Sequence, residues 1–221
     1  MIPILSLGNK NYSSWSLRPW LALRWAAIDF EEKVIQLGGP GYGKSRIPEI
    51  LAMSPSGRVP ALTLADGTIW DSLAICEWVA ETAPEAGLWP RERFARAVCR
   101  STVCEMHSGF SALRRDLGMN IRRRTSPRDW PADTRADLER IDALWTSLRE
   151  RRGTRGPFLF GARSIADAFY APVVTRLRTY GVPLTPVVAA YCEAVLADSA
   201  FREWESAALA ETWTIPETDA L

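Results

Sequence analysis

The sequence is poor in residues that hold metal ions. Its 221 residues include a single histidine, His107, and four cysteines, none of which forms a Cys-x-x-Cys pair. A structural zinc site needs about four such ligands at short spacings, so we expect no metal. The cysteines at positions 76, 99, 104 and 192 fall in mostly apolar, helical patterns. This predicts buried free thiols in a reducing compartment, and therefore a cytoplasmic protein.

The sequence also lacks an excess of charge of one sign and any long apolar run. It has 27 Lys and Arg against 26 Asp and Glu. No apolar stretch approaches the roughly 18–20 residues that span a bilayer, and no signal peptide is visible. We therefore expect neither nucleic acid nor a membrane as a partner. A short basic cluster, residues 122–124 with Arg128, is expected to be a solvated helix end and loop.

The first third of the chain alternates between strand and helix patterns. Apolar runs at 2–7 and 31–37 flank a helical pattern at 17–28, which predicts a parallel β-α-β unit. Asp66-Gly67 between two apolar runs predicts an antiparallel hairpin. Further helices are expected at 47–53, where the pattern is short, and at 72–81. The order β-α-β-(α)-β-β-α is thioredoxin-like, and we place this α/β domain at residues 1–82.

Beyond a linker at 83–90, only helical patterns occur. The chain therefore divides into the α/β domain and an all-α domain at residues 90–221. Within the second domain, Ser164 and Asp167 have the spacing of a capping box, which predicts a role in folding. The expected helices span 92–124 (with a bend near Gly109 or Gly118), 133–152, 164–180, 186–198 and 201–211.

A serine-rich segment stands where the first strand leads into the first helix. It comprises residues 12–18, YSSWSLR. Backbone N–H groups at a helix start, together with the positive end of the helix dipole, favour an anion. A hydroxyl there, from Ser13 or Ser14, is able to donate to a thiolate and lower the pKa of the thiol. Simple capping of the helix is the alternative use of these serines.

Two further motifs follow. In residues 54–62, SPSGRVPAL, a cis Val59-Pro60 bond would turn the Val59 backbone outward to pair with an extended peptide. An ordinary trans proline at a strand entrance is the alternative. Asp71-Ser72, at a predicted helix start, suits a free α-amino group at the acid and an α-carboxylate at the hydroxyl and helix N-terminus.

In this order and at this spacing, the three motifs resemble those of the cytosolic glutathione S-transferases, bacterial members included. The resemblance implies a thioredoxin-like domain followed by an all-helical domain, with glutathione extended across the first. It also implies a homodimer. The glutathione thiol would lie at the serine-rich segment and the γ-glutamyl end at the acid-serine pair. The implied glutathione contacts are Tyr12, Arg58, Val59, Pro60, Asp71, Ser72 and, at the glycine end, Lys44.

Within that family, residues 13–18 are similar to the Ser-Ser-Cys-x-x-Arg run of the zeta class, which isomerises maleylacetoacetate through a glutathione adduct. By this register Ser13 is the catalytic serine and Ser14 its neighbour. Trp15 replaces the zeta cysteine, which leaves isomerase and other transferase activities open. The implied reaction is attack of the thiolate on a small electrophile held between the domains. The expected walls of the electrophile pocket include Trp15, Met106, His107 and Phe110.

Two other functions compete with this interpretation. Residues 38–45, GGPGYGKS, match the phosphate-binding pattern G-x-x-x-x-G-K-[ST]. That site needs a long helix directly afterwards, but Pro48 and Pro55 limit any helix there to about two turns. A nucleotide site of this kind also needs an acid that holds the metal ion. The candidate, Asp66, is predicted to lie in a hairpin turn. The second alternative is a glutathione-binding module without catalysis, against which the intact set of three motifs argues.

Overall fold

The computed structural model describes residues 1–38 and 47–221. One mixed sheet forms in the order β2-β1-β3-β4. β1 is parallel to β2 and antiparallel to β3, and β3 pairs with β4 as a hairpin. The predicted β-α-β unit and hairpin are therefore confirmed. The strands are β1 (Ile4–Gly8), β2 (Glu31–Ile35), β3 (Ala61–Leu64) and β4 (Gly67–Trp70).

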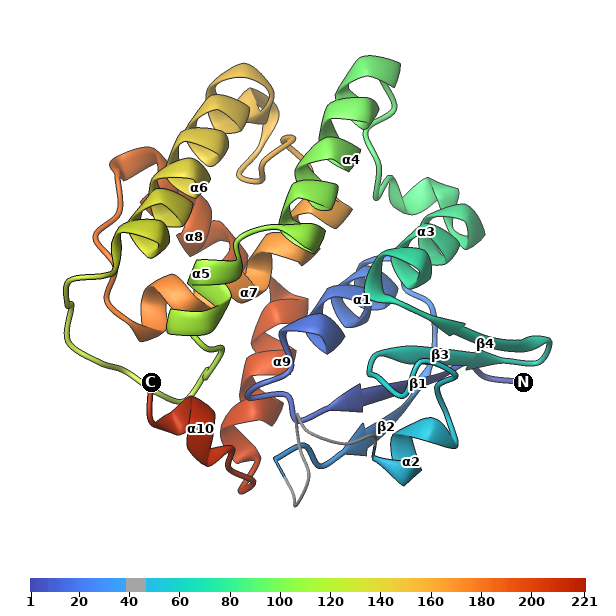
Figure 1. Ribbon diagram of the computed structural model, residues 1–221. Coiled ribbons are helices and arrows are strands. Elements are labelled where there is room, and N and C mark those ends of the chain that lie inside the picture. The colour runs from blue at the N-terminus through green and yellow to red at the C-terminus, as the bar shows by residue number, and fades with distance from the viewer. Residues whose placement is uncertain (39–46) are drawn as a thin grey trace.

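Three helices belong to this sheet. α1 (Ser14–Trp25) and α3 (Ser72–Thr82) pack together on one face, and α2 (Pro48–Leu51) lies on the other (Figure 1). α2 is a single short helix that begins at a proline, as expected. It is too short for the long helix that a nucleotide-binding phosphate loop requires. The phosphate-loop motif itself lies outside the described residues, apart from Gly38.

The rest of the chain is helical. α7 is buried along almost its whole length and packs against α1, α4 and α8, so it is the central helix. In the described part of the chain, no helix is both long and apolar enough to cross a bilayer. Single 3-10 turns occur at Pro84–Ala86 and Gly153–Arg155. The helices are α4 (Arg93–Ser108), α5 (Ser111–Asp116), α6 (Ala132–Arg151), α7 (Ile165–Thr179), α8 (Pro186–Ala197), α9 (Ser199–Ala210) and α10 (Pro216–Asp219).

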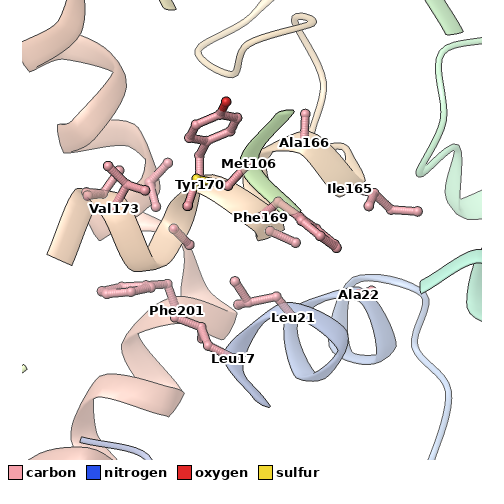
Figure 2. Packing of buried hydrophobic residues seen from close by; sticks show 14 of the residues in the cluster. Leu17, Leu21, Ala22, Met106, Ile165, Ala166, Phe169, Tyr170, Val173 and Phe201 are labelled. Atoms are coloured by element: carbon pink, nitrogen blue, oxygen red, sulfur yellow. The ribbon is translucent and has the colours of Figure 1, made fainter. Parts of the chain in front are cut away.

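The sheet part and the helical part share one hydrophobic core. Leu17 and Leu21 of α1 face Phe169 of α7 and Phe201 of α9 (Figure 2). Burying each such side chain stabilises the fold by about 1.5–3 kcal/mol. The helix that follows the serine-rich segment is therefore anchored by the helical part as well as by the sheet. The expected combination of a thioredoxin-like α/β part and an all-helical part is confirmed.

The prediction of one long helix over residues 92–124 is wrong in its second half. The chain breaks between α4 and α5, and no helix follows α5 until α6. Side chains of α7 and its C-terminal end take the carbonyl groups that a continued helix would use. Tyr180 Oη donates to the Gly118 carbonyl at 3.1 Å, and Thr179 Oγ1 donates to the Asn120 carbonyl at 2.8 Å. Tertiary contacts therefore outweigh the local helical preference.

Only part of the basic cluster is the solvated helix end and loop that we expected, since Arg124 and Arg128 are exposed and lie outside any helix. Arg122 and Arg123 are half-buried and lie outside any helix. Arg122 donates to the Trp213 carbonyl at 2.7 Å, and Arg123 donates to the Asp219 carbonyl. These guanidinium groups are turned toward the C-terminal segment because its backbone carbonyls offer acceptors there. The prediction for Arg122 and Arg123 is therefore wrong.

The four cysteines are free. Cys76, Cys99 and Cys192 are buried, as predicted. Burial raises the pKa of the Cys99 and Cys192 thiols to about 12, and it raises that of Cys76 further. Cys104 is exposed, so the prediction of a buried thiol is wrong at this position. Its place on the outer side of α4 shows that an apolar neighbourhood in sequence does not decide which helix face is covered.

Candidate active site

A cavity of about 700 Å³ opens at the N-terminus of α1. It brings the first two sequence motifs together with residues of α5, α7 and the C-terminal segment. The described lining residues come from three parts of the chain: Tyr12, Ser13, Ser14, Trp15 and Leu37 from the first strand-helix-strand unit, Ile47, Ile50, Ser56, Gly57, Arg58 and Val59 around α2, and Arg114, Gly118, Met119, Arg176, Ile215 and Thr218 from the helical part.

Ser13 is the residue that precedes α1, and it is buried. Its side chain makes no capping bond to the helix. Instead, Ser13 Oγ donates to Ser16 Oγ at 2.7 Å, and Ser16 Oγ accepts the backbone N–H of Gly8 at 3.1 Å. The Ser13 backbone N–H donates to the Asn9 carbonyl at 2.8 Å. The Ser13 side chain therefore does not cap α1, which was the alternative role considered for it.

Ser14 is the first residue of α1 and is also buried against the cavity. Its hydroxyl has no hydrogen-bond partner among residues 1–38 and 47–221. Both serine hydroxyls thus lie at the positive end of the α1 dipole, where an anion is favoured. Rotation of the Ser13 O–H away from Ser16, or use of the Ser14 O–H as it stands, would supply a donor to a bound thiolate.

Tyr12 lines the cavity, but its hydroxyl group is bonded to other residues of the chain. The hydroxyl donates to Asp219 Oδ1 at 2.8 Å and accepts from Arg122 at 3.2 Å. The ring packs in a small apolar cluster with Leu37 and Ile215. The hydroxyl is therefore already occupied by the C-terminal segment.

Trp15 is 36% exposed and forms a platform for positive groups. The guanidinium carbon of Arg18 lies 4.1 Å from its ring centre, and that of Arg114 lies 4.9 Å away. Such cation–π contacts each contribute about 0.5–2 kcal/mol. Arg18 is completely buried, and its guanidinium has no hydrogen-bond partner in the described part of the chain. Burial, and then repulsion by Arg114, hold the pKa of Arg18 well below its usual value.

The second motif meets the cavity through Arg58 and Val59. The Val59-Pro60 peptide bond is cis, as the motif suggested. Pro60 itself is buried and does not line the cavity. Lys44, expected near the glycine end of glutathione, lies outside the described residues.

The acid-serine pair lies at the start of α3, outside the lining of the cavity. Asp71 has a φ of +76°, a conformation uncommon for a residue other than glycine and frequent at functional sites. One carboxylate oxygen accepts the Leu73 backbone N–H at 2.8 Å, and the other lies 3.3 Å from His107 Nε2. Ser72 Oγ is buried and has no partner among the described residues. This unsatisfied hydroxyl beside an acid suits a ligand with both an amine and a carboxylate.

Two arginines of the cavity were not anticipated. Arg114 of α5 and Arg176 of α7 line it, and no Asp or Glu does so among the described residues. Burial, and secondly repulsion by Arg114, lower the pKa of Arg176 to about 9, which leaves it charged at pH 7. A sequence signal for Arg176 does exist, because it falls on a helix most of whose residues are apolar. Buried arginines of this kind favour anionic ligands.

Other expected pocket residues lie elsewhere. Met106 and Phe110 belong to the hydrophobic core and do not line the cavity. His107 contacts the edge of Trp15, with ring centres 5.4 Å apart, and approaches Asp71. The face of α4 that we assigned to the electrophile is instead packed inward. Among the described residues, no group of three His, Cys, Asp or Glu side chains is placed to hold a metal ion.

Comparison with known proteins identifies the family. The family model "Glutathione S-transferase, N-terminal domain" matches residues 12–82, and "Glutathione S-transferase, C-terminal domain" matches residues 121–194. The chain is 30% identical to maleylacetoacetate isomerase of Rattus norvegicus over 203 residues, 90% of each chain.

Solved structures share the fold. A glutathione transferase homologue from Burkholderia gl BGR1, with bound glutathione, has a TM-score of 0.70 and 24% identity, and the match covers 96% of this chain and all of that one. A bacterial maleyl pyruvate isomerase, described as a zeta-class glutathione S-transferase, has a TM-score of 0.70 and 22% identity, with 96% and 100% covered. From these matches together with the site geometry, the chain belongs to the glutathione S-transferase family.

Proposed function

We propose that this protein is a glutathione transferase that stabilises the glutathione thiolate with a serine and directs it onto a small electrophile. One observation supports this most strongly. The cavity combines the buried hydroxyls of Ser13 and Ser14, at the N-terminus of α1, with three arginines and no acid among its described lining residues. The pKa of a free thiol is about 8.5, so a positive, donor-rich cavity increases the thiolate fraction at neutral pH.

In this proposal glutathione extends from the serines toward the start of α3. Its cysteinyl backbone pairs with Val59, its α-amino group meets Asp71, and its α-carboxylate meets Ser72. The unpartnered Ser72 hydroxyl and the positive φ of Asp71 support this placement. Arg58 is the cation expected near the glycine carboxylate, together with Lys44.

The arginines point to an electrophile that carries carboxylates. Arg114 and Arg176 reach the cavity from α5 and α7, and a guanidinium pairs well with a carboxylate. A zeta-like cis–trans isomerisation is therefore the second candidate, and the likeness to the rat isomerase supports it. The thiolate would add to one carbon of the cis double bond, the resulting single bond would rotate, and elimination would return the thiolate with the trans product.

The role of the serines is tested by separating binding from turnover. Glutathione binding is followed by tryptophan fluorescence, and turnover by conjugation of 1-chloro-2,4-dinitrobenzene. Ser13→Ala should lower kcat while glutathione affinity stays close to that of the wild type. Asp71→Ala should weaken glutathione binding instead. A loss of turnover in Ser14→Ala but not in Ser13→Ala would assign the sulfur to Ser14, and full turnover in both variants would contradict serine activation.

Isomerase and conjugating activities differ in how much glutathione they use. With maleylacetoacetate in excess over glutathione, an isomerase converts many substrate molecules for each glutathione, because the thiol is returned. A conjugating enzyme stops after one equivalent. Saturable glutathione binding without either reaction would favour the non-catalytic module instead.

We further propose that the protein acts as a cytoplasmic homodimer. Its four free cysteines suit a reducing compartment. Trp70 on the edge strand β4 is 48% exposed and Phe94 on α4 is 65% exposed, and in this proposal the second subunit covers them. Light scattering after gel filtration should give twice the 24.7 kDa chain mass. Phe94→Asp should shift the protein toward the monomer, and a wild-type monomer would contradict the proposal.

A further inference from the structure

Residues 211–221, here called the C-terminal strap, leave α9 and run back beside the serine-rich segment (Figure 1). The first end of the strap is held at the backbone. The carboxylate of Glu211 accepts the N–H groups of Lys10 at 2.7 Å and Asn11 at 3.0 Å. Arg122 donates to the carbonyls of Glu211 and Trp213. This end is therefore tied to the loop that carries the serines.

The middle of the strap forms one wall of the cavity. Ile215 is buried against Leu37 and Ile50, and Ile215 and Thr218 both line the cavity. The strap passes so close to Gly38 that a Cβ added there would lie 2.8 Å from Ile215 Cγ1. Gly38 also has a φ of +90°, so a side chain is excluded at this position for two reasons.

The far end of the strap, in α10, is held by side-chain bonds. Asp219 accepts from Tyr12 Oη at 2.8 Å and from Asn120 Nδ2 at 2.7 Å. Arg123 donates to the Asp219 carbonyl. α10 has only four residues, and a helix of one turn has no stability of its own in water. Its position therefore depends on these contacts and on the packing of Ile215.

We propose that α10 is a gate over the electrophile cavity, latched by Asp219 to Tyr12 and Asn120, with the Glu211 end as its fixed hinge. Opening breaks the side-chain bonds of Asp219 and withdraws Ile215 and Thr218 from the cavity wall. The hinge stays in place because its acceptor is bound by two backbone N–H groups. The Tyr12 hydroxyl then serves the latch and not the glutathione sulfur. The identity of the gated ligand rests on the proposed function, whereas the latch does not.

The latch is tested by hydrogen–deuterium exchange of the peptide that covers α10, in the full-length protein. Asp219→Ala should accelerate exchange of the Thr218, Asp219 and Ala220 amides by roughly tenfold or more, the effect of losing hydrogen bonds to a charged group. Glu217→Ala is the matched control, since Glu217 is an exposed acid of the same helix. It removes the same charge and should leave exchange unchanged.

Tyr12→Phe provides the second arm, because it removes the hydroxyl and keeps the ring. Exchange should accelerate, and the Tyr12→Phe/Asp219→Ala double variant should exchange no faster than Asp219→Ala alone, as expected for partners in one interaction. Unchanged exchange in Asp219→Ala, or equal acceleration in Glu217→Ala, would overturn the latch.

Kinetics test the gate. Asp219→Ala should raise the electrophile KM by roughly tenfold and leave glutathione affinity unchanged. Faster exchange with an unchanged electrophile KM would overturn the gate. Absence of any turnover in the wild type would be a failure of the proposed function, visible before any variant is made, and the exchange data would still decide the latch.

Discussion

Asp167 should contribute more to stability than a surface capping residue does. Its carboxylate is completely buried and accepts the backbone N–H of Leu159 at 3.1 Å and that of Ser164 at 2.8 Å, as well as the Ser164 hydroxyl at 2.8 Å. The capping box expected from sequence is confirmed. In Asp167→Ala, two buried N–H groups lose their acceptor, and each such loss costs about 1–3 kcal/mol. We therefore expect a loss of about 2–6 kcal/mol, above the ~0.5–2 kcal/mol of an ordinary cap.

The assay is urea unfolding followed by tryptophan fluorescence, with the slope checked to be the same in both proteins. Asp167→Asn is the control, because its amide oxygen still accepts one of the two N–H groups, so it should lose less. A decrease in the free energy of unfolding below about 1 kcal/mol for Asp167→Ala, with an unchanged slope, would refute the argument that two buried N–H groups lose their acceptor.

The same residue makes a prediction about pH. Burial outweighs the bonds from Leu159 and Ser164 and raises the pKa of Asp167 from 3.8 to about 6. The folded state therefore binds the proton more tightly than the unfolded state does. The part of the stability that comes from tighter proton binding by Asp167 is complete below pH 4 and is lost as the pH rises through about 6. A shift of about two pKa units corresponds to about 3 kcal/mol. The stability of the wild type minus that of Asp167→Asn should fall by this order between pH 4 and pH 7, and a rise would contradict the sign.

Two further predictions concern the cavity and the thiols. Arg176→Gln should raise the KM for maleylacetoacetate by roughly tenfold or more, as expected for a lost charged hydrogen bond. The KM for neutral 1-chloro-2,4-dinitrobenzene should change far less. Arg178→Gln, on the same helix but outside the cavity, is the control, and equal effects of Arg176→Gln on both substrates would argue against a carboxylate partner. In native protein, one thiol per chain should react quickly with a disulfide reagent, because the other three thiols are buried and have raised pKa values. Cys104→Ser should remove that reaction. Rapid reaction of more than one thiol per chain would contradict the burial.

The order of the elements in the α/β part was predictable because it rests on local signals. Alternation of apolar residues, the Asp66-Gly67 turn and the short stretch before Pro55 each act over a few residues, and the structure follows them. The cis Val59-Pro60 bond and the capping box at Ser164 are local in the same sense. Local signals also locate the serines at a helix start, because the strand before them and the helix after them are both marked in the sequence.

The composition of the cavity could not be predicted in the same way. Arg114 and Arg176 lie far from the serines along the chain, and their presence in the cavity depends on how α7 packs against α1 and how α5 packs against α6. Met106 and Phe110 show the reverse case, since both are buried in the core and do not line the cavity. A helical pattern identifies an apolar face but does not say which neighbour will cover it.

By itself, therefore, the sequence determined the element types, the two-part architecture and the three motifs, because hydrogen bonding within a helix or turn and the spacing of apolar residues act locally. Only the tertiary structure decided that Arg122 and Arg123 hold the C-terminal strap, that the Tyr12 hydroxyl meets Asp219, and that α10 forms a cavity wall. These contacts join residues about a hundred or more positions apart. Their geometry exists only after the shared core has fixed α1 against α7 and α9, which is why no local pattern could reveal them.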